Sequence, residues 1–303
     1  MALPFITHGP VKASLMMKNC KPLAKVLSIQ DLCCFGKCSL TLALPIISAC
    51  GVQCCPLPTA LLSTHTGGLG QVVKLNNSEL LLPIAKHLQQ VAPRFDAIYT
   101  GYMANPAQAL QCANIIDLLQ AKQVLVDPAF ADNGKLYSGF DETMVAAFIG
   151  LLKKADIICP NITEALFLLG KDPTQTPATL QALQNIAQSL GSLGPSTIIL
   201  TGCLCELGSC VVLYQKSNAQ FEILPYKPIA GKFHGTGDGF AACLVACLCR
   251  EISLQKSVQM AMDFVTQSIE RSVALAEDTR FGLAIEYTLP LLMQAVEDAL
   301  CQK

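Results

Sequence analysis

The tetrapeptide Gly235-Thr236-Gly237-Asp238 carries the strongest chemical signal in the sequence, and it stands directly before the apolar segment 239–249. Glycines at a helix start let backbone N–H groups approach an anion, and the helix dipole favours negative charge there. An aspartate at the same place can accept a proton from an attacking hydroxyl group while the N–H groups hold a transferring phosphoryl group. The pattern predicts a phosphoryl-transfer site. A plain helix cap made by Thr236 or Asp238 is the structural alternative.

A second candidate site is the segment Asn161-Ile162-Thr163-Glu164, which follows an apolar run and precedes a short helical pattern. Asn161 or Thr163 can cap that helix, with Glu164 complementing the dipole in its first turn. Alternatively, Asn161 and Glu164 face a triphosphate and hold magnesium through water. The residue types alone leave both interpretations open.

Polar residues gather where the predicted strands end, which is where ligands bind in an open parallel sheet. These groups include three carboxylates, two amides and two threonines, more polar chemistry than structural loops require. The groups are Gln30-Asp31, Thr100-Gly101-Tyr102, Asp127-Pro128, Pro160-Asn161 with Glu164, and Thr201-Gly202.

The elements that must position these residues alternate along the chain, which predicts β-α-β units and an α/β fold with a mostly parallel central sheet. The strand-like runs are apolar almost throughout, as expected for strands covered on both faces. Strands are predicted at 26–29, 51–55, 97–100, 123–126, 157–159 and 197–200. Helices are predicted at 78–91, 106–121, 143–154 and 179–190.

The pattern changes after Thr201-Gly202. The runs 211–214 and 221–224 predict an antiparallel hairpin, and three helices are predicted at 237–250, 254–276 and 289–301. Residues 1–24 lack periodicity and are interpreted as an N-terminal extension, either loosely ordered or a remnant of a targeting segment. No linker divides the remainder, so residues 25–303 are predicted to form one domain.

Composition excludes several classes of function. The net charge is −1 and there is no cluster of Lys or Arg, which argues against a nucleic-acid partner. Hydrophobic residues make up 52% of the chain, but the longest charge-free stretch, 38–73, is interrupted by Pro and Gly. The densest apolar run, 240–249, is about half the length of a membrane span. We therefore expect no membrane association.

The sixteen cysteines mostly lie inside apolar runs, and no Cys-x-x-Cys occurs. They are interpreted as buried, reduced thiols rather than as a disulfide scaffold or a zinc site. Reduced thiols are typical of a reducing compartment, so a cytoplasmic location is expected.

Taken together and in order, these motifs resemble the ribokinase-like superfamily. They are Gly235–Asp238, Asn161-x-x-Glu164, Asp127-Pro128 with Asp132-Asn133-Gly134, and Thr100-Gly101-Tyr102. The N-terminal segments 26–30, 35–41 and 59–68 are similar to those of pyridoxal and pyridoxamine kinases. The resemblance covers about 26–281 and implies a three-layer α/β/α fold. It also implies a kinase that phosphorylates the 5′-hydroxymethyl group of a vitamin B6 vitamer. A P-loop is absent from the sequence.

The resemblance also implies roles for individual residues. Asp238 would be the base, and the N–H groups of Gly235, Thr236 and Gly237 would form the anion hole. Asn161, Glu164 and Asp127 would organise Mg²⁺. The residues implied near ATP are Asp127, Asp132, Asn161, Thr201 and Gly202. Those implied around the pyridine ring are Asp31, His65, Thr66 and Tyr102. A homodimer is implied, and a requirement for K⁺ is left open.

One residue departs from the animal-type enzymes of this family, which carry a serine where this chain has Asp31. A carboxylate there can accept a hydrogen bond from a protonated ring nitrogen or attract a cationic substituent. Two alternatives stay open beside the B6 kinase. One is a hydroxymethylpyrimidine kinase, and the other is a non-catalytic protein that binds a vitamer or a nucleotide.

Overall fold

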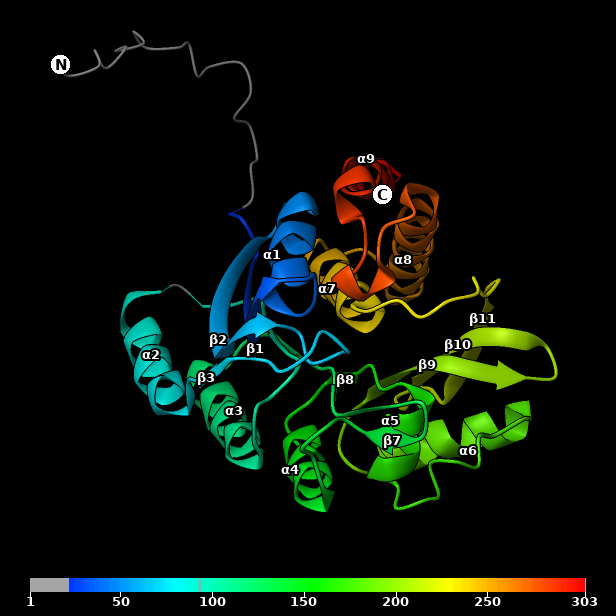
Figure 1. The fold of residues 1–303 in the computed structure, drawn as a ribbon, viewed down its shortest axis with the longest axis horizontal. Helices are drawn as coiled ribbons and strands as arrows, with labels where there is room; N and C mark the ends of the chain where they lie inside the picture. Colours follow the sequence, from blue (N-terminus) through cyan, green and yellow to red (C-terminus); the bar gives the residue numbers. More distant parts are fainter. Residues whose placement is uncertain (1–21, 93, 303) are drawn as a thin grey trace, which may run out of the picture.

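A nine-stranded sheet with the order β11-β10-β9-β8-β5-β4-β1-β2-β3 forms the middle layer of the molecule. The computed structural model describes residues 22–92 and 94–302. Helices cover both faces of the sheet, so the three-layer α/β/α prediction is confirmed (Figure 1).

Six neighbouring strands run parallel, and their central members are apolar because both faces are covered. All four residues of β4 are buried. The parallel strands are β1 (Lys25–Phe35), β2 (Gln53–Thr64), β4 (Ala97–Thr100), β5 (Gln123–Val126), β8 (Ile157–Ile158) and β9 (Thr197–Cys205).

The sheet is extended at both edges by antiparallel strands, because short connections allow hairpins there. The predicted hairpin is confirmed as β10 (Gly208–Gln215) and β11 (Gln220–Pro225), and β3 (Lys74–Asn76) pairs with β2 at the other edge. A separate two-stranded ribbon consists of β6 (Ala131–Asp132) and β7 (Lys135–Leu136).

Five helices cover one face of the sheet and enclose the larger hydrophobic core. Each turns a limited apolar stripe inward, as Leu81 and Ala85 show in α2. The five are α2 (Ser78–Val91), α3 (Pro106–Leu119), α4 (Glu142–Leu152), α5 (Ile162–Leu168) and α6 (Leu180–Gly191).

The opposite face is covered by α1 (Leu40–Ala49), α7 (Thr236–Cys249), α8 (Leu254–Leu275) and α9 (Leu289–Cys301). Two 3₁₀ turns, Thr279–Phe281 and Ile285–Tyr287, lead into α9. Every residue of α7 from Gly239 to Cys247 is buried, because the helix lies between the sheet, α1 and α8. This position explains the apolar run in the sequence.

Several element boundaries differ from the sequence prediction. β1 and β2 continue well past their predicted ends, so Asp31 lies within β1, at a shift in register against β2, rather than in a loop after it. Thr201 likewise lies within β9. Helix α1 was not predicted, because Pro45 interrupts its pattern and packing against α7 compensates for the proline.

None of the helices in the described part of the chain is long and apolar enough to cross a bilayer. Each of the fifteen cysteines in the same residues is a free thiol. The predicted extension, 1–24, falls almost entirely outside the described residues. The single-domain interpretation of 25–303 stays a prediction.

Candidate active site

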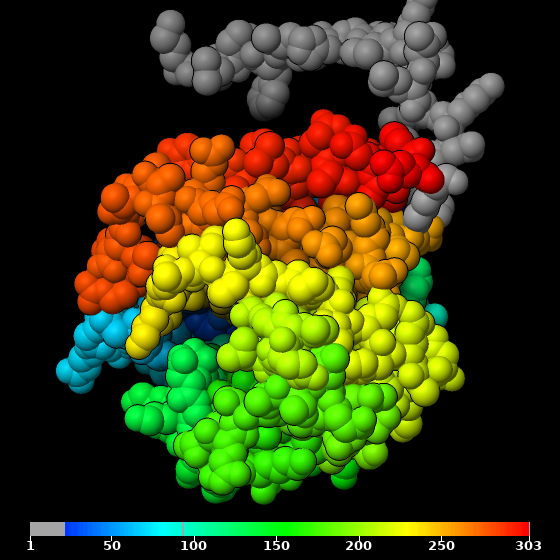
Figure 2. Space-filling model, turned by 90° about the vertical axis from the view of Figure 1, so that its right-hand side faces the viewer, coloured from blue at the N-terminus to red at the C-terminus, as the bar shows by residue number. Residues whose placement is uncertain are grey.

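A pocket of about 640 Å³ opens at the carboxyl ends of the parallel strands. Its mouth is visible in Figure 2 as a hollow below the yellow segment that precedes α7. All the site residues named from the sequence line this pocket, which brings together segments up to two hundred residues apart. They are Asp31, His65, Thr66, Tyr102, Asp127, Asp132, Asn161, Glu164, Thr201, Gly202, Gly235, Thr236, Gly237 and Asp238.

The N-terminus of α7 points into the pocket without a side-chain cap. Its N-cap residue, Gly235, has φ +82°, and a Cβ there would lie 2.5 Å from both Leu42 Cδ1 and the Lys37 carbonyl oxygen. Only glycine fits that conformation and that space. The helix-cap interpretation of Thr236 and Asp238 is therefore wrong. The N–H groups of the first turn stay available for an anion.

Asp238 is half-buried in the first turn of α7, and one carboxylate oxygen is held from outside the helix. The backbone N–H of Ser39 donates to Asp238 Oδ2 at 2.9 Å. Desolvation and, to a smaller extent, the charge of the nearby Asp31 raise the pKa of Asp238 to about 6, against the lowering effect of that hydrogen bond. A base with this pKa is ionised at neutral pH and binds a proton more readily than an ordinary aspartate.

Asp127 and Glu164 form a second acidic group, and both carboxyl groups are buried. Burial raises the pKa of Asp127, and the charge of Asp238 raises it further. Burial and the charge of Asp127 act in the same way on the pKa of Glu164. Backbone N–H groups of Phe130 and Asn161 hold the Glu164 carboxylate in place. Carboxylate oxygens are hard donors that Mg²⁺ prefers, so Asp127 and Glu164 fit a magnesium site.

The Asn161 side chain is occupied by the fold, as its capping alternative predicted. Its Oδ1 accepts from the Glu164 N–H at 3.0 Å, and Glu164 Oε2 accepts from the Asn161 N–H at 2.9 Å, which completes a capping box. The Asn161 amide also donates to the Ala131 carbonyl oxygen at 2.8 Å. Its contacts thus position Glu164, and they give no support to a direct role at a metal.

The remaining residues predicted near ATP lie on the same side of the pocket. Thr201 forms an isolated bridge with Asn161, and Gly202 follows it with φ +64°. Asp132 is exposed on the β6–β7 ribbon and accepts from the Asn133 N–H. An exposed carboxylate on a short ribbon can change position more easily than the buried Asp127.

The residues predicted around a pyridine ring line another part of the pocket. Asp31 is buried, its Oδ2 accepts from the Cys33 thiol at 3.2 Å, and burial raises its pKa. Tyr102 stacks on Phe140 with ring centroids 5.6 Å apart, and the Lys74 ammonium lies 5.7 Å from the Tyr102 centroid. This part of the pocket combines a flat aromatic surface with a buried carboxyl group.

His65 has a structural hydrogen-bond pattern. Its Nδ1 accepts from the Gly67 N–H at 3.0 Å, and its Nε2 contacts the Arg280 carbonyl oxygen, which assigns the proton to Nε2. The ring of His234 stacks on His65 at 4.7 Å. A Cβ on Gly67 would lie 2.3 Å from His234 Cε1, so glycine permits this stacking. Thr66, which stands between His65 and Gly67 in the sequence, also lines the pocket.

Ser39 and His234 were missed by the sequence analysis. Ser39 contacts Asp238 through its backbone, and a backbone role leaves no trace in residue type. Its φ of +52°, rare for a serine, becomes evident only in the structure. His234 immediately precedes Gly235, and a histidine beside a predicted anion site is the signal that could have identified it.

The three-layer sheet, the uncapped glycine turn and the carboxylates that line the same pocket place the chain in the ribokinase-like class. The chain belongs to the phosphomethylpyrimidine kinase family, whose sequence pattern matches residues 44–281.

Relatives in this family have different substrates in their names. The chain is 27% identical over 236 residues to a thiamine biosynthetic bifunctional enzyme of Arabidopsis thaliana, covering 76% of this chain and 43% of the relative. It spans about half the length of that enzyme and of its rice counterpart.

Two solved structures share the fold over nearly their whole length. A Bacteroides thetaiotaomicron protein, described as a phosphomethylpyrimidine kinase and crystallised with pyridoxal, is 32% identical with a TM-score of 0.83. The match covers 89% of this chain and 96% of that one. Pyridoxal kinase from Lactobacillus plantarum is 28% identical with a TM-score of 0.84, covering 91% and 99% of the two chains.

Proposed function

We propose that this protein transfers the γ-phosphoryl group of ATP to the 5′-hydroxymethyl group of a vitamin B6 vitamer. One observation carries the proposal. Asp238, with a pKa of about 6, lies beside the uncapped N-terminus of α7 and shares a pocket with Asp127 and Glu164. A base, an anion-binding helix terminus and a buried pair of carboxylates are the components that phosphoryl transfer requires.

In this proposal, Asp238 accepts the proton of the vitamer hydroxyl group as its oxygen attacks the γ-phosphorus. The new oxygen–phosphorus bond forms as the bond from the γ-phosphorus to the β-phosphate oxygen breaks, and ADP leaves. The N–H groups at Gly235, Thr236 and Gly237 hold the negative charge on the transferring group. The Ser39 N–H keeps Asp238 oriented by occupying Oδ2, which leaves Oδ1 for the proton.

Mg²⁺ bound with ATP would neutralise phosphate charge, and a site at Asp127 and Glu164 suits it. Asn161 contributes by fixing the Glu164 carboxylate through the capping box. Thr201, Gly202 and Asp132 are proposed to lie beside the nucleotide. A K⁺ requirement rests on the family resemblance alone.

A B6 vitamer is proposed as substrate over hydroxymethylpyrimidine for two reasons. The relative from Bacteroides thetaiotaomicron was crystallised with pyridoxal and shares 32% identity. In addition, Asp31 and Tyr102 combine a carboxyl group with an aromatic face, which suits a ring that carries a basic nitrogen. Hydroxymethylpyrimidine is the second candidate, because the family and the plant relatives include thiamine enzymes.

The test is an ATP-dependent phosphorylation assay with Mg²⁺ that offers pyridoxal, pyridoxine, pyridoxamine and hydroxymethylpyrimidine in parallel. The proposal predicts turnover of the B6 vitamers and a loss of about 10²–10⁴-fold in kcat for Asp238→Asn. Asp298→Asn, which changes an exposed aspartate on α9, is the matched control. Turnover of hydroxymethylpyrimidine alone would select the second candidate. ATP binding without turnover of any substrate would select the non-catalytic alternative.

We also propose that residues 25–303 act as one kinase domain within a homodimer. Exposed apolar side chains at Leu61, Val73 and Leu75 lie along the β2–β3 edge and support a subunit contact there. Light scattering should give twice the chain mass of 32.3 kDa, and Leu75→Asp should give a monomer. A monomeric parent protein at micromolar concentration would refute the proposal.

A further inference from the structure

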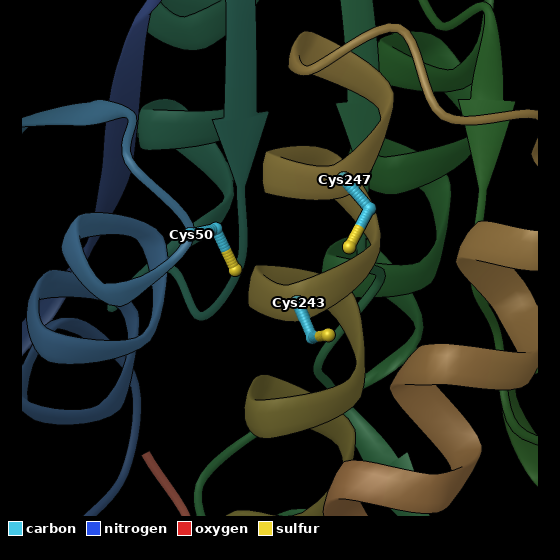
Figure 3. A group of neighbouring side chains, drawn as sticks. All are labelled: Cys50, Cys243 and Cys247. Carbon is cyan, nitrogen blue, oxygen red and sulfur yellow. The ribbon is translucent and has the colours of Figure 1, made fainter. Parts of the chain in front are cut away.

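Three buried thiols converge between α1 and α7, outside the active-site pocket. The Sγ atoms of Cys50, Cys243 and Cys247 all lie within 4.8 Å of one another. Each residue is at most 1% exposed, and none of the three lines the pocket. Figure 3 shows Cys50 pointing toward the two consecutive turns of α7 that carry the other cysteines.

The fold holds these thiols together through backbone geometry. Cys50 is the C-cap residue of α1, and its N–H donates to the Ile46 carbonyl oxygen at 3.2 Å. Cys243 and Cys247 are four residues apart on α7, so their side chains lie on the same face of the helix. Because α1 packs directly on α7, three sulfur atoms meet where aliphatic side chains would pack equally well.

A positively charged side chain lies beside the three thiols. The Arg250 guanidinium is anchored nearby, since Nη1 donates to the Cys50 carbonyl oxygen at 3.0 Å. A guanidinium in this position can balance part of the negative charge of thiolates that bind a metal ion.

We propose that Cys50, Cys243 and Cys247 form a three-thiolate binding site for a single Cu(I) ion. Thiolate–metal bonds of about 2.3 Å in a trigonal arrangement place the sulfur atoms about 4 Å apart. The observed separations need little adjustment to reach that value.

The number of ligands selects the ion. Zn²⁺ takes four ligands in a structural site, but the group contains only three among the residues that the structure describes, and it is shielded from water. Cu(I) is soft, prefers thiolates and is satisfied by three of them. The positive charges of the ion and of Arg250 together offset two of the three negative charges of the sulfur atoms. Binding releases protons, so affinity should fall as the pH is lowered.

The ion would connect the two helices that meet at the active site. Ser39 is the N-cap residue of α1 and Asp238 lies in the first turn of α7, while the cysteines lie further along the same two helices. A ligand that binds only the folded protein raises its stability, so Cu(I) should raise the melting temperature.

The test is an anaerobic competition titration of Cu(I), kept reduced with ascorbate, against a chromogenic Cu(I) chelator. The two thiols that are exposed in the described part of the chain are first removed by Cys34→Ser and Cys301→Ser, and this double variant serves as the parent. The parent should bind one ion per chain. Cys50→Ala, Cys243→Ala and Cys247→Ala should each weaken binding by at least about 100-fold. Cys112→Ala, which removes one buried thiol on α3, should leave the affinity unchanged.

A second measurement needs no cysteine variant, so it applies even if the variants fail to fold. X-ray absorption of the loaded parent should show three sulfur atoms at about 2.3 Å and no nitrogen or oxygen ligand. The proposal is overturned if the parent binds no ion tightly, or if the spectrum shows two or four ligands. It is also overturned if binding survives in all three cysteine variants. That result would assign the ion to another thiol group, such as Cys203, Cys205 and Cys210.

Discussion

The backbone N–H of Ser39 donates a 2.9 Å hydrogen bond to Asp238 Oδ2 across 199 positions of sequence. Ser39 has φ +52°, an unusual conformation for a serine, and it is the N-cap residue of α1. The contact holds the proposed base from outside its own helix and limits the rise in its pKa. The orientation of Asp238 thus depends on the segment before α1 as well as on α7.

The pKa of about 6 for Asp238 predicts a pH dependence of activity. Asp238 accepts a proton only when ionised, so kcat/KM should rise about tenfold per pH unit below pH 6 and level off above it. A pH–rate profile from pH 5 to 8 measures this rise in kcat/KM. Asp238→Asn should lack it, which separates Asp238 from the titration of ATP itself. A flat profile in the parent protein would contradict the assignment.

Gly235→Ala should damage both stability and activity. The new Cβ would meet the Lys37 carbonyl oxygen and Leu42 Cδ1 at 2.5 Å, in a backbone conformation that alanine disfavours. Gly139→Ala is a matched control, since its φ of +85° is nearly the same and a Cβ there has open space. We expect Gly235→Ala to lower the free energy of unfolding by roughly 1–3 kcal/mol more than the control does. Equal losses in thermal or urea unfolding would argue against the close contact at Gly235.

Asp127→Asn should make the metal-free protein more stable and the enzyme less active. Burial and the charge of Asp238 raise the pKa of Asp127, and burial and the charge of Asp127 raise the pKa of Glu164, so removing the Asp127 charge relieves repulsion. In EDTA, we therefore expect a higher free energy of unfolding than that of the parent protein, measured by urea denaturation. With Mg²⁺, kcat should fall at least about 10-fold.

The control for Asp127→Asn is Asp117→Asn, which breaks the surface ion pair with Lys154. Asp117→Asn should change the free energy of unfolding little, because exposed ion pairs contribute little to stability. If Asp127→Asn instead destabilises the EDTA-treated protein, the proposed repulsion between the buried carboxylates does not dominate.

Asp31→Ser should change the preference among vitamers. The buried Asp31 carboxyl group can attract a cationic amino substituent, so the variant should lose about 10-fold in kcat/KM for pyridoxamine relative to pyridoxal. Asp31→Asn, which keeps the shape without the charge, should shift the ratio in the same direction. If the ratios of kcat/KM among pyridoxal, pyridoxine and pyridoxamine are unchanged in both variants, the hypothesis is wrong.

The α/β class, the parallel centre of the sheet and the Gly235–Asp238 turn could be predicted from sequence because they depend on local signals. Strand β4 matches its predicted bounds, since its apolar run is bounded by turn residues on both sides. The residues between Gln30 and Phe35 were not predicted as strand. They pair with β2, a partner whose register no local pattern encodes.

Residue type and spacing determined which side chains can hold an anion, a cation or a proton, because those capacities belong to the chemistry of each residue. Tertiary structure decided which of them do so together. It excluded a side-chain cap at α7, committed Asn161 to capping α5, set Ser39 against Asp238 and brought Cys50 to Cys243 and Cys247. Each of these outcomes depends on the distance between segments far apart in the chain, and only packing sets that distance.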